Sequence, residues 1–261
     1  MPTVAARDDA AEGGSVRRVR SPFDSLVDSY DAARPSYPPG LYAALPPLDG
    51  ALVADIGAGT GIATRGLTEH GADVVAFDIG ANVLARLRAN GAAAPGRLVA
   101  TAVADAHALP LRAACVDLVT YAQAFHWVRA AEAAAEARRV LRPGGALAVW
   151  WNDSAAQAEP WWRSQQEMLE VANRSYSRDY RVHDVAADLR AVFADVTTAQ
   201  VPWERRLDIE SYLVYLRSKS YVSALGDLLP DFLDAQRAIL SGAFPDGTVV
   251  EPFVTRLWVA R

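Results

Sequence analysis

Apolar residues along the middle of the chain follow two different spacings. Short, nearly all-apolar runs predict buried strands, and between them leucine, valine and alanine recur at helical spacing. Strands are expected at 51–56, 73–78, 97–103, 115–121 and 146–151, and helices at 61–70, at 82–90 and in an alanine-rich segment that ends near Leu141. Such an alternation of strands and helices is typical of a parallel sheet covered on both faces.

The pattern changes after Trp151. Residues 158–190 look helical, a strand is expected near 196–203, helices are expected at about 208–218 and 230–241, and a closing strand is expected at 248–260. Pro252 fits an edge or a bulge better than a strand interior, because proline cannot donate to a ladder. The late helices have no sheet partner, so we expect them to cap the ligand edge of the sheet.

The predicted organisation has four parts. They are a disordered tail at 1–20, N-terminal cap helices with the core of alternating strands and helices at 21–152, a helical cap insertion at 153–195, and the final strands with further cap helices at 196–261.

Composition narrows the functional classes. The 261 residues are 51% hydrophobic and 22% charged, with a net charge of −5, so no nucleic-acid partner is expected. Cys115 is the only cysteine, which excludes an intrachain disulfide framework, and no side-chain cluster predicts a metal site. No apolar run reaches the roughly 18 residues that span a bilayer, so we expect no membrane contact and a cytoplasmic location. Lys219 is the only lysine, which we interpret as codon bias of a GC-rich genome.

Three glycines, Gly57, Gly59 and Gly61, follow the first strand and precede a helix. Only glycine lets a backbone turn so tightly and still leaves room for a ligand against it. The alternative interpretation is a plain strand–helix turn. A dinucleotide site requires Gly-x-Gly-x-x-Gly, but Ile62 occupies the last position, so a nicotinamide oxidoreductase is disfavoured. Asp78 ends the second strand, where a carboxylate can accept both ribose hydroxyls; the alternative is a helix N-cap.

Five motifs stand in one order along the chain: Tyr30-Asp-Ala-Ala-Arg-Pro-Ser-Tyr-Pro38, Asp55-Ile-Gly-Ala-Gly-Thr-Gly61, Asp105-Ala-His-Ala-Leu-Pro110, Gln123-Ala-Phe-His-Trp127 and Leu141-Arg-Pro-Gly-Gly145. Together they resemble the class I S-adenosylmethionine-dependent methyltransferases, in the methyltransferase type 11 branch that includes ubiquinone/menaquinone-pathway and trans-aconitate methyltransferases. The resemblance implies an α/β fold with a Rossmann-like sheet, mostly parallel with an antiparallel last strand, with helices on both faces and a helical cap.

The resemblance also implies a set of cofactor contacts. The methionine part is implied to contact the loop backbone at Gly57, Ala58, Gly59 and Gly61, with Asp55 at its amino group and Arg34 or Tyr30 at its carboxylate. Asp78 is implied to bind the ribose, Ile79 and Ala106 to contact the faces of the adenine, and Asp105 to bind the adenine amine. Gln123 is implied to lie near the sulfonium. The implied ligands are S-adenosylmethionine and its product S-adenosylhomocysteine. Arg34-Pro can also be read as a structural turn.

His126 is the titratable side chain that the motif places near the transferred methyl. It can act as a general base towards the acceptor, or it can only shape the pocket. Several aromatic residues fall at strand ends or in the cap; they are Trp127, Trp150, Trp151, Trp161, Trp162, Tyr176, Tyr180 and Tyr221. If several of them line the ligand edge, the acceptor is apolar or aromatic. Arg163, Arg174, Arg178 and Arg181 can offer positive charge to a carboxylated acceptor, or can form a solvated face.

The predicted function is therefore methyl transfer to the oxygen, nitrogen or carbon of a small organic molecule, such as a specialised-metabolism intermediate. The alternative is a protein that binds S-adenosylmethionine without transferring a methyl group, as a regulator or a cyclase. The sequence specifies neither the acceptor nor the oligomeric state.

Overall fold

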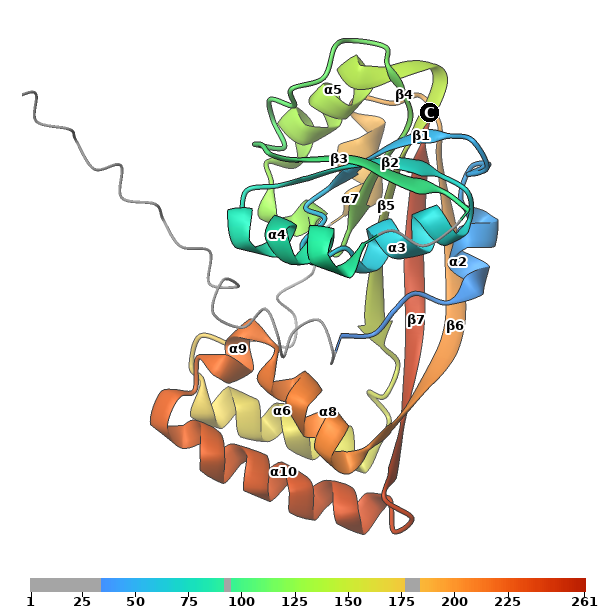
Figure 1. Cartoon of the computed structure of the whole chain (residues 1–261). Coiled ribbons are helices and arrows are strands. Elements are labelled where there is room, and N and C mark those ends of the chain that lie inside the picture. The colour runs from blue at the N-terminus through green and yellow to red at the C-terminus, as the bar shows by residue number, and fades with distance from the viewer. Residues whose placement is uncertain (1–33, 92–94, 177–183) are drawn as a thin grey trace, which may run out of the picture.

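Seven strands form one sheet in the order β3-β2-β1-β4-β5-β7-β6 (Figure 1). The computed structural model describes residues 34–91, 95–176 and 184–261. The strands are β1 (Leu52–Ile56), β2 (Asp73–Asp78), β3 (Arg97–Val103), β4 (Val116–Ala122), β5 (Leu141–Ser154), β6 (Val196–Asp208) and β7 (Thr248–Ala260). The pairs among β1 to β5 are parallel, and β7 is antiparallel to both β5 and β6. This confirms the predicted fold class.

Helices cover both faces of the sheet. On one face lie α2 (Pro39–Ala44), α3 (Ile62–Glu69) and α4 (Ala81–Asn90), and on the other lie α5 (Ala130–Val140) and α7 (Val185–Arg190). Alternate strand residues supply the two cores: Val53 packs with α2 and α3, whereas Ala54 packs with α5 and α7. This two-sided burial explains why the strands read as nearly continuous apolar runs.

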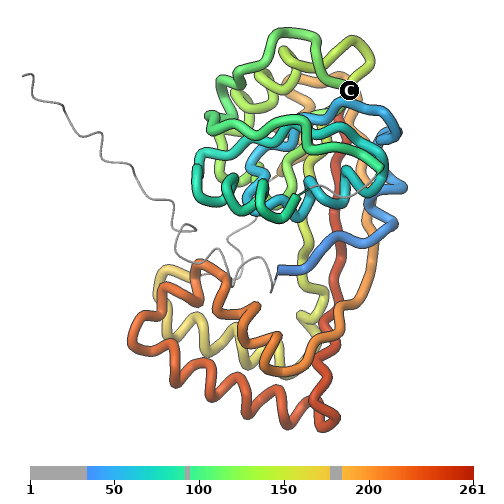
Figure 2. The backbone as a smooth tube through the Cα atoms, in the orientation of Figure 1, coloured from blue at the N-terminus to red at the C-terminus, as the bar shows by residue number. Residues whose placement is uncertain are grey.

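A separate layer of helices forms the cap. It contains α6 (Pro160–Ala172), α8 (Ile209–Arg217), α9 (Ser220–Ser223) and α10 (Leu229–Ala243), which share apolar clusters of their own. The strands β5, β6 and β7 have 13 or 14 residues, whereas β1 to β4 have five to seven. Figures 1 and 2 show these long strands running from the core sheet to the cap. The cap therefore stands on continuous strands that belong to the sheet.

The predicted boundaries need three corrections. The expected cap insertion at 153–195 is divided, because α7 packs against α5, β6 and β7 on the core sheet and not in the cap. The strand expected at 196–203 continues to Asp208, where it pairs with Thr248. The run from 158 to 190 is not one helical stretch, since α6 ends at Ala172.

Pro252 lies beside the end of a ladder. The last pair between β5 and β7 joins Ser154 to Phe253, so the nitrogen of Pro252 needs no partner strand on that side. The strand still pairs with β6 at this point, through Glu204. The predicted tail at 1–20 lies outside the described residues. None of the described helices is long and apolar enough to cross a membrane.

Candidate functional site

The loop between β1 and α3 has bare backbone in the left-handed region. The φ angles of Gly57, Gly59 and Gly61 are 67°, 55° and 89°. A Cβ on Gly57 would lie 2.6 Å from the Cβ of Ala124, and a Cβ on Gly61 would lie 2.8 Å from Leu87. A Cβ on Gly59 would meet no atom within 4 Å. Two of the glycines are thus required by close packing, whereas Gly59 lies against open space.

Asp78, at the end of β2, fixes this loop. Its two carboxylate oxygens accept hydrogen bonds from the backbone N–H groups of Gly59 (2.9 Å) and Gly80 (2.8 Å). The alternative reading as a helix N-cap does not hold, because the N-cap of α4 is Gly80. A carboxylate oxygen can accept more than one hydrogen bond, so the predicted ribose contact is compatible with this arrangement.

Asp55 lies beneath the loop and has no exposed surface. Its carboxylate accepts hydrogen bonds from the hydroxyls of Thr64 (2.7 Å) and Thr120 (2.9 Å). Burial raises the pKa of Asp55 to about 6, against the opposing effect of the two hydroxyls. The predicted contact with the ligand amino group stays a prediction; the structure shows that Asp55 ties β1 to α3 and β4.

The raised pKa of Asp55 has a consequence for stability. The folded protein holds the Asp55 proton up to about pH 6, whereas the unfolded chain releases it near pH 4, so the contribution of Asp55 to the free energy of unfolding falls as pH rises through this window. We expect the stability difference between the wild type and Asp55→Asn to change by about 2–3 kcal/mol between pH 4 and pH 7.5, in favour of the wild type at low pH. Urea unfolding of both proteins across this range measures it, and a difference that is constant with pH contradicts it.

Gln123 follows β4 at the same edge of the sheet. It is a non-glycine residue in the left-handed region, with a φ angle of 57°. Its backbone N–H donates to the carbonyl of Trp150 (2.9 Å), and its side-chain amide donates to the carbonyl of Asn152 (3.3 Å). Backbone strain of this kind persists only where the surroundings fix it, and it concentrates at functional sites. The two hydrogen bonds of Gln123 and the packing of Ala124 against Gly57 hold Gln123 beside the glycine loop despite this strain.

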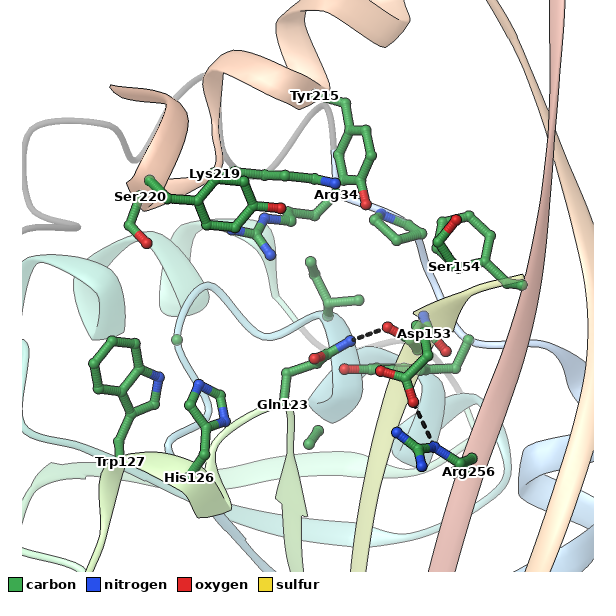
Figure 3. A pocket seen from close by; sticks show the side chains of 18 of the residues that line it. Arg34, Gln123, His126, Trp127, Asp153, Ser154, Tyr215, Lys219, Ser220 and Arg256 are labelled. Atoms are coloured by element: carbon green, nitrogen blue, oxygen red, sulfur yellow. Dashed lines mark hydrogen bonds and ion pairs between the residues drawn. The ribbon is translucent and has the colours of Figure 1, made fainter. Parts of the chain in front are cut away.

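A cavity of about 1250 Å³ lies between this edge and the cap. The residues that line it come from the N-terminal arm (Arg34, Pro35, Tyr37), the glycine loop (Gly57, Ala58, Gly59, Thr60), the end of β4 and the turn after it (Gln123, His126, Trp127), the end of β5 (Asn152, Asp153, Ser154), and the cap (Trp162, Gln166, Tyr215, Lys219, Tyr221), among others. Figure 3 shows Lys219, Tyr215 and Arg34 on the cap side, with Gln123 and His126 below them. The cavity thus joins the predicted cofactor loop to the cap.

His126 is held by the indole of Trp151. The indole Nε1–H donates to Nδ1 of His126 at 3.2 Å. An indole nitrogen only donates, so Nδ1 carries no hydrogen in this arrangement and the neutral ring carries its hydrogen on Nε2. Any ligand that meets Nε2 would therefore meet a hydrogen-bond donor. The predicted role of His126 as a general base stays a prediction, and this hydrogen bond weighs against it.

The tautomer of His126 can be tested directly. We expect ¹⁵N–¹H correlation spectra, recorded at a pH where the imidazole is neutral, to show His126 in the Nε2–H form, because the indole N–H of Trp151 donates to Nδ1. His107 is the internal comparison: its Nδ1 bonds the Asp105 carboxylate and its Nε2 accepts from the N–H of Arg129, which predicts the opposite tautomer. Trp151→Phe should remove the tautomer preference of His126 and leave that of His107 unchanged. A spectrum with His126 in the Nδ1–H form would restore the base role.

The predicted adenine contacts lie outside the cavity described above. Asp105 accepts a hydrogen bond from the backbone N–H of His107 (2.9 Å). This bond, together with a second one to the side chain of His107, lowers the pKa of Asp105. Ala106 is buried, whereas the side chain of Ile79 is 74% exposed at the end of β2. An apolar side chain this exposed is available to stack on an adenine ring. Asp78 and Val103 pair at the ends of β2 and β3, so these residues share the edge on which the glycine loop lies.

Of the predicted contacts, Gly57, Ala58, Gly59, Gln123, His126 and Arg34 line the cavity, whereas Asp55, Gly61, Asp78, Ile79, Asp105 and Ala106 do not. Tyr30 lies outside the described residues. Arg34 donates to the carbonyl of Ser218 at 3.2 Å, and so joins the N-terminal arm to the cap. Each predicted ligand contact stays a prediction.

Sequence reasoning missed three polar features of the cavity. Asn152 donates to the carbonyl of Ser36 and accepts from the hydroxyl of Thr255 (2.6 Å). Asp153 and Arg256 form an ion pair at 2.6 Å. Lys219 lines the cap side, although the sequence offered only its uniqueness as a signal.

The aromatic residues divide between core and cavity. Trp127, Trp162, Tyr176 and Tyr221 line the cavity, whereas Trp150, Trp151 and Trp161 are buried. Tyr180 lies outside the described residues, as do Arg178 and Arg181. Arg163 lines the cavity and Arg174 does not. Among the residues that the structure describes, no group of three or more His, Cys, Asp or Glu could hold a metal ion.

Comparisons with known proteins agree on one class. Residues 54–149 match the methyltransferase domain family. An uncharacterised methyltransferase of Mycobacterium tuberculosis is 36% identical over 220 residues, which cover 84% of this chain and 85% of the relative. A malonyl-[acyl-carrier protein] O-methyltransferase of Enterobacter lignolyticus is 36% identical over 62% of this chain and 63% of its own length. A solved structure from Anaeromyxobacter dehalogenans that carries the name of a type II methyltransferase is 25% identical, with a TM-score of 0.66 over 87% of this chain and 97% of the other.

Proposed function

The chain belongs to the class I S-adenosylmethionine-dependent methyltransferases, and from this premise we propose that it methylates a small organic acceptor held in the cavity between the sheet edge and the cap. The relatives share the class but do not indicate the acceptor of this chain, so the proposal of the acceptor rests on the cavity.

The glycine loop fits the cofactor. Gly59 has bare backbone against open space inside the cavity, and this single observation carries the proposal most directly. Bound there, S-adenosylmethionine supplies a methyl group that is already activated for in-line displacement. The residues that would hold it are the loop at 57–59 for the methionine part, Gln123 near the sulfonium, and Asp78 with Ile79 for the nucleoside. Arg34 suits the methionine carboxylate because a guanidinium binds a carboxylate through two parallel hydrogen bonds.

The remaining work of the protein is to hold the acceptor and exclude water. A cavity of about 1250 Å³ exceeds the usual range of roughly 300–1,000 Å³ for small-molecule sites, which leaves room for a cofactor and an acceptor together. Trp162, Tyr176 and Tyr221 give the cap side aromatic surface, which favours an apolar or aromatic acceptor. Holding acceptor and methyl group at near-attack distance in a dry site provides most of the rate enhancement such a transfer needs.

Two measurements test this function. Calorimetry with S-adenosylhomocysteine should show binding to the purified protein, and labelled S-adenosylmethionine should pass its methyl group to at least one member of a panel of small aromatic and apolar acceptors. Binding without transfer to any acceptor would favour the rival of a non-transferring protein, and absence of binding would overturn the proposal.

A further inference from the structure

The cap presents one ammonium group to the cavity. Lys219 lies between α8 and α9, and its Nζ is 4.4 Å from the ring centroid of Tyr215 and 5.9 Å from that of Tyr221. All three residues line the cavity. Figure 3 shows the Lys219 side chain extended beside Tyr215 on the cap side. The rings fix the direction of the side chain without neutralising its charge.

Glu251, a buried carboxylate that interacts electrostatically with Lys219, has an ion-pair partner of its own. Glu251 pairs with Arg205 at 2.8 Å, with both side chains at least nine-tenths buried. The guanidinium of Arg205 also lies 4.0 Å from the ring centroid of Tyr215. Lys219 and Arg205 both act on Glu251 through their charges and lower its pKa against the effect of burial, but only Arg205 forms the hydrogen-bonded ion pair with it. Within the described part of the chain, the ammonium group of Lys219 makes no hydrogen bond or ion pair, and only the backbone of this residue is hydrogen-bonded.

The other charged side chains on the cavity wall form ion pairs or hydrogen bonds with the protein. Arg256 pairs with Asp153, and Asp184 accepts from the N–H of Ala187 at the start of α7. Arg163 donates to the carbonyl of Ala158 and is exposed. Across the described residues that line the cavity, four cationic side chains, Arg34, Arg163, Lys219 and Arg256, face two carboxylates, Asp153 and Asp184. The cavity thus carries an excess of positive charge before a cationic sulfonium enters it.

We infer that the acceptor is a small aromatic or apolar carboxylic acid whose carboxylate is bound by Lys219. This inference rests on the proposed function and adds the substrate class. The ammonium supplies charge-assisted hydrogen bonds, and the surrounding rings take the apolar body of the acid. An anionic acceptor also complements the charge of the sulfonium that shares the cavity. A neutral amide of the same shape lacks the charge and should bind much more weakly.

The test uses matched acids and amides on the full chain saturated with S-adenosylhomocysteine. The probes are phenylacetate against phenylacetamide and 3-phenylpropionate against its amide, titrated by calorimetry. We expect the wild type to bind the acids at least ~10-fold more tightly than the amides, since a charge-assisted hydrogen bond contributes about 10- to 100-fold in affinity. Lys219→Met should remove this preference, and Lys219→Arg should retain part of it.

Arg217→Met is the matched control. It removes one exposed positive charge from α8, two residues before Lys219, at a position that does not line the cavity. The acid preference should be unchanged in this variant, and S-adenosylhomocysteine should bind all four proteins alike. Equal binding of acids and amides to the wild type, no binding of the acids, or a preference that survives in Lys219→Met would overturn the inference. Such results with the product still bound would leave the proposed function intact.

A second readout needs no variant. Lys219 is the only lysine of the chain, so an amine-selective reagent followed by peptide mass spectrometry reports its accessibility separately from that of the N-terminal amine. The acids should protect Lys219 from modification and the amides should not. Equal modification with acid and amide would count against a contact between the carboxylate and this ammonium.

Discussion

Replacing Gly59 by alanine is expected to weaken the binding of S-adenosylhomocysteine by about 100-fold or more while the protein stays folded. The φ angle of 55° costs a non-glycine residue about 1–2 kcal/mol, and the new methyl group would project into the space proposed for the cofactor. No protein atom lies within 4 Å of that Cβ, so the core has no reason to rearrange. Calorimetry measures the affinity, and thermal unfolding confirms the fold.

Two other glycine variants make this result interpretable. Gly247→Ala has a similar backbone cost, with a φ angle of 77° and no atom near the new Cβ, but it lies before β7 and away from the loop. This variant should bind S-adenosylhomocysteine with the affinity of the wild type. Gly57→Ala should instead destabilise the protein, because its Cβ would lie 2.6 Å from that of Ala124. Unchanged affinity in Gly59→Ala would show that the cofactor does not lie against this loop.

The sheet was predictable because strands buried on both faces appear in the sequence as short, nearly continuous apolar runs. Val53 and Ala54 are buried on opposite faces, so β1 reads as one apolar run. The location of α7 left no comparable record. An amphipathic helix has the same pattern whether it covers α5 on the core sheet or a helix of the cap, and only the contacts of Val185 and Leu189 with the core decide it.

The cavity was harder to predict than the loop. Glycines after a strand carry local geometric information, so Gly57 and Gly59 could be placed from sequence. Trp150 falls in a predicted strand and is fully buried against α2 and α3, whereas Trp162 lines the cavity, an outcome that depends on how the cap packs against long-range partners. Lys219 lines the cavity because of the same long-range packing, and its ammonium group and the guanidinium of Arg205 both contact the ring of Tyr215.

Structure also changes the meaning of the two acidic landmarks. Asp55 and Asp78 were predicted as ligand contacts, and both are hydrogen-bonded to the protein itself. Asp55 has no exposed surface, so its main measurable effect should be on stability. Asp78 bonds the N–H of Gly59, the glycine that lies against open space, so its effect should be on the cofactor. The structure thus predicts different measurable effects for two carboxylates that the sequence analysis both assigned to the cofactor.

Asp78→Ala is accordingly expected to weaken the binding of S-adenosylhomocysteine by about 30- to 150-fold, equivalent to about 2–3 kcal/mol. The variant removes the proposed ribose acceptor and also the bonds that hold the N–H groups of Gly59 and Gly80. Asp78→Asn keeps one oxygen acceptor but loses the charge, so an intermediate affinity is expected.

Asp117→Ala provides the matched control for Asp78→Ala, again by calorimetry. Asp117 also accepts from a backbone N–H, that of Leu52, but it lies at the opposite end of β1 from the glycine loop. Its loss should lower the melting temperature without changing the affinity for the product. If both variants bound the product as the wild type does, Asp78 would be a structural residue and the nucleoside would lie elsewhere. If only Asp78→Ala lost affinity, the carboxylate one strand away from the glycine loop would belong to the cofactor site.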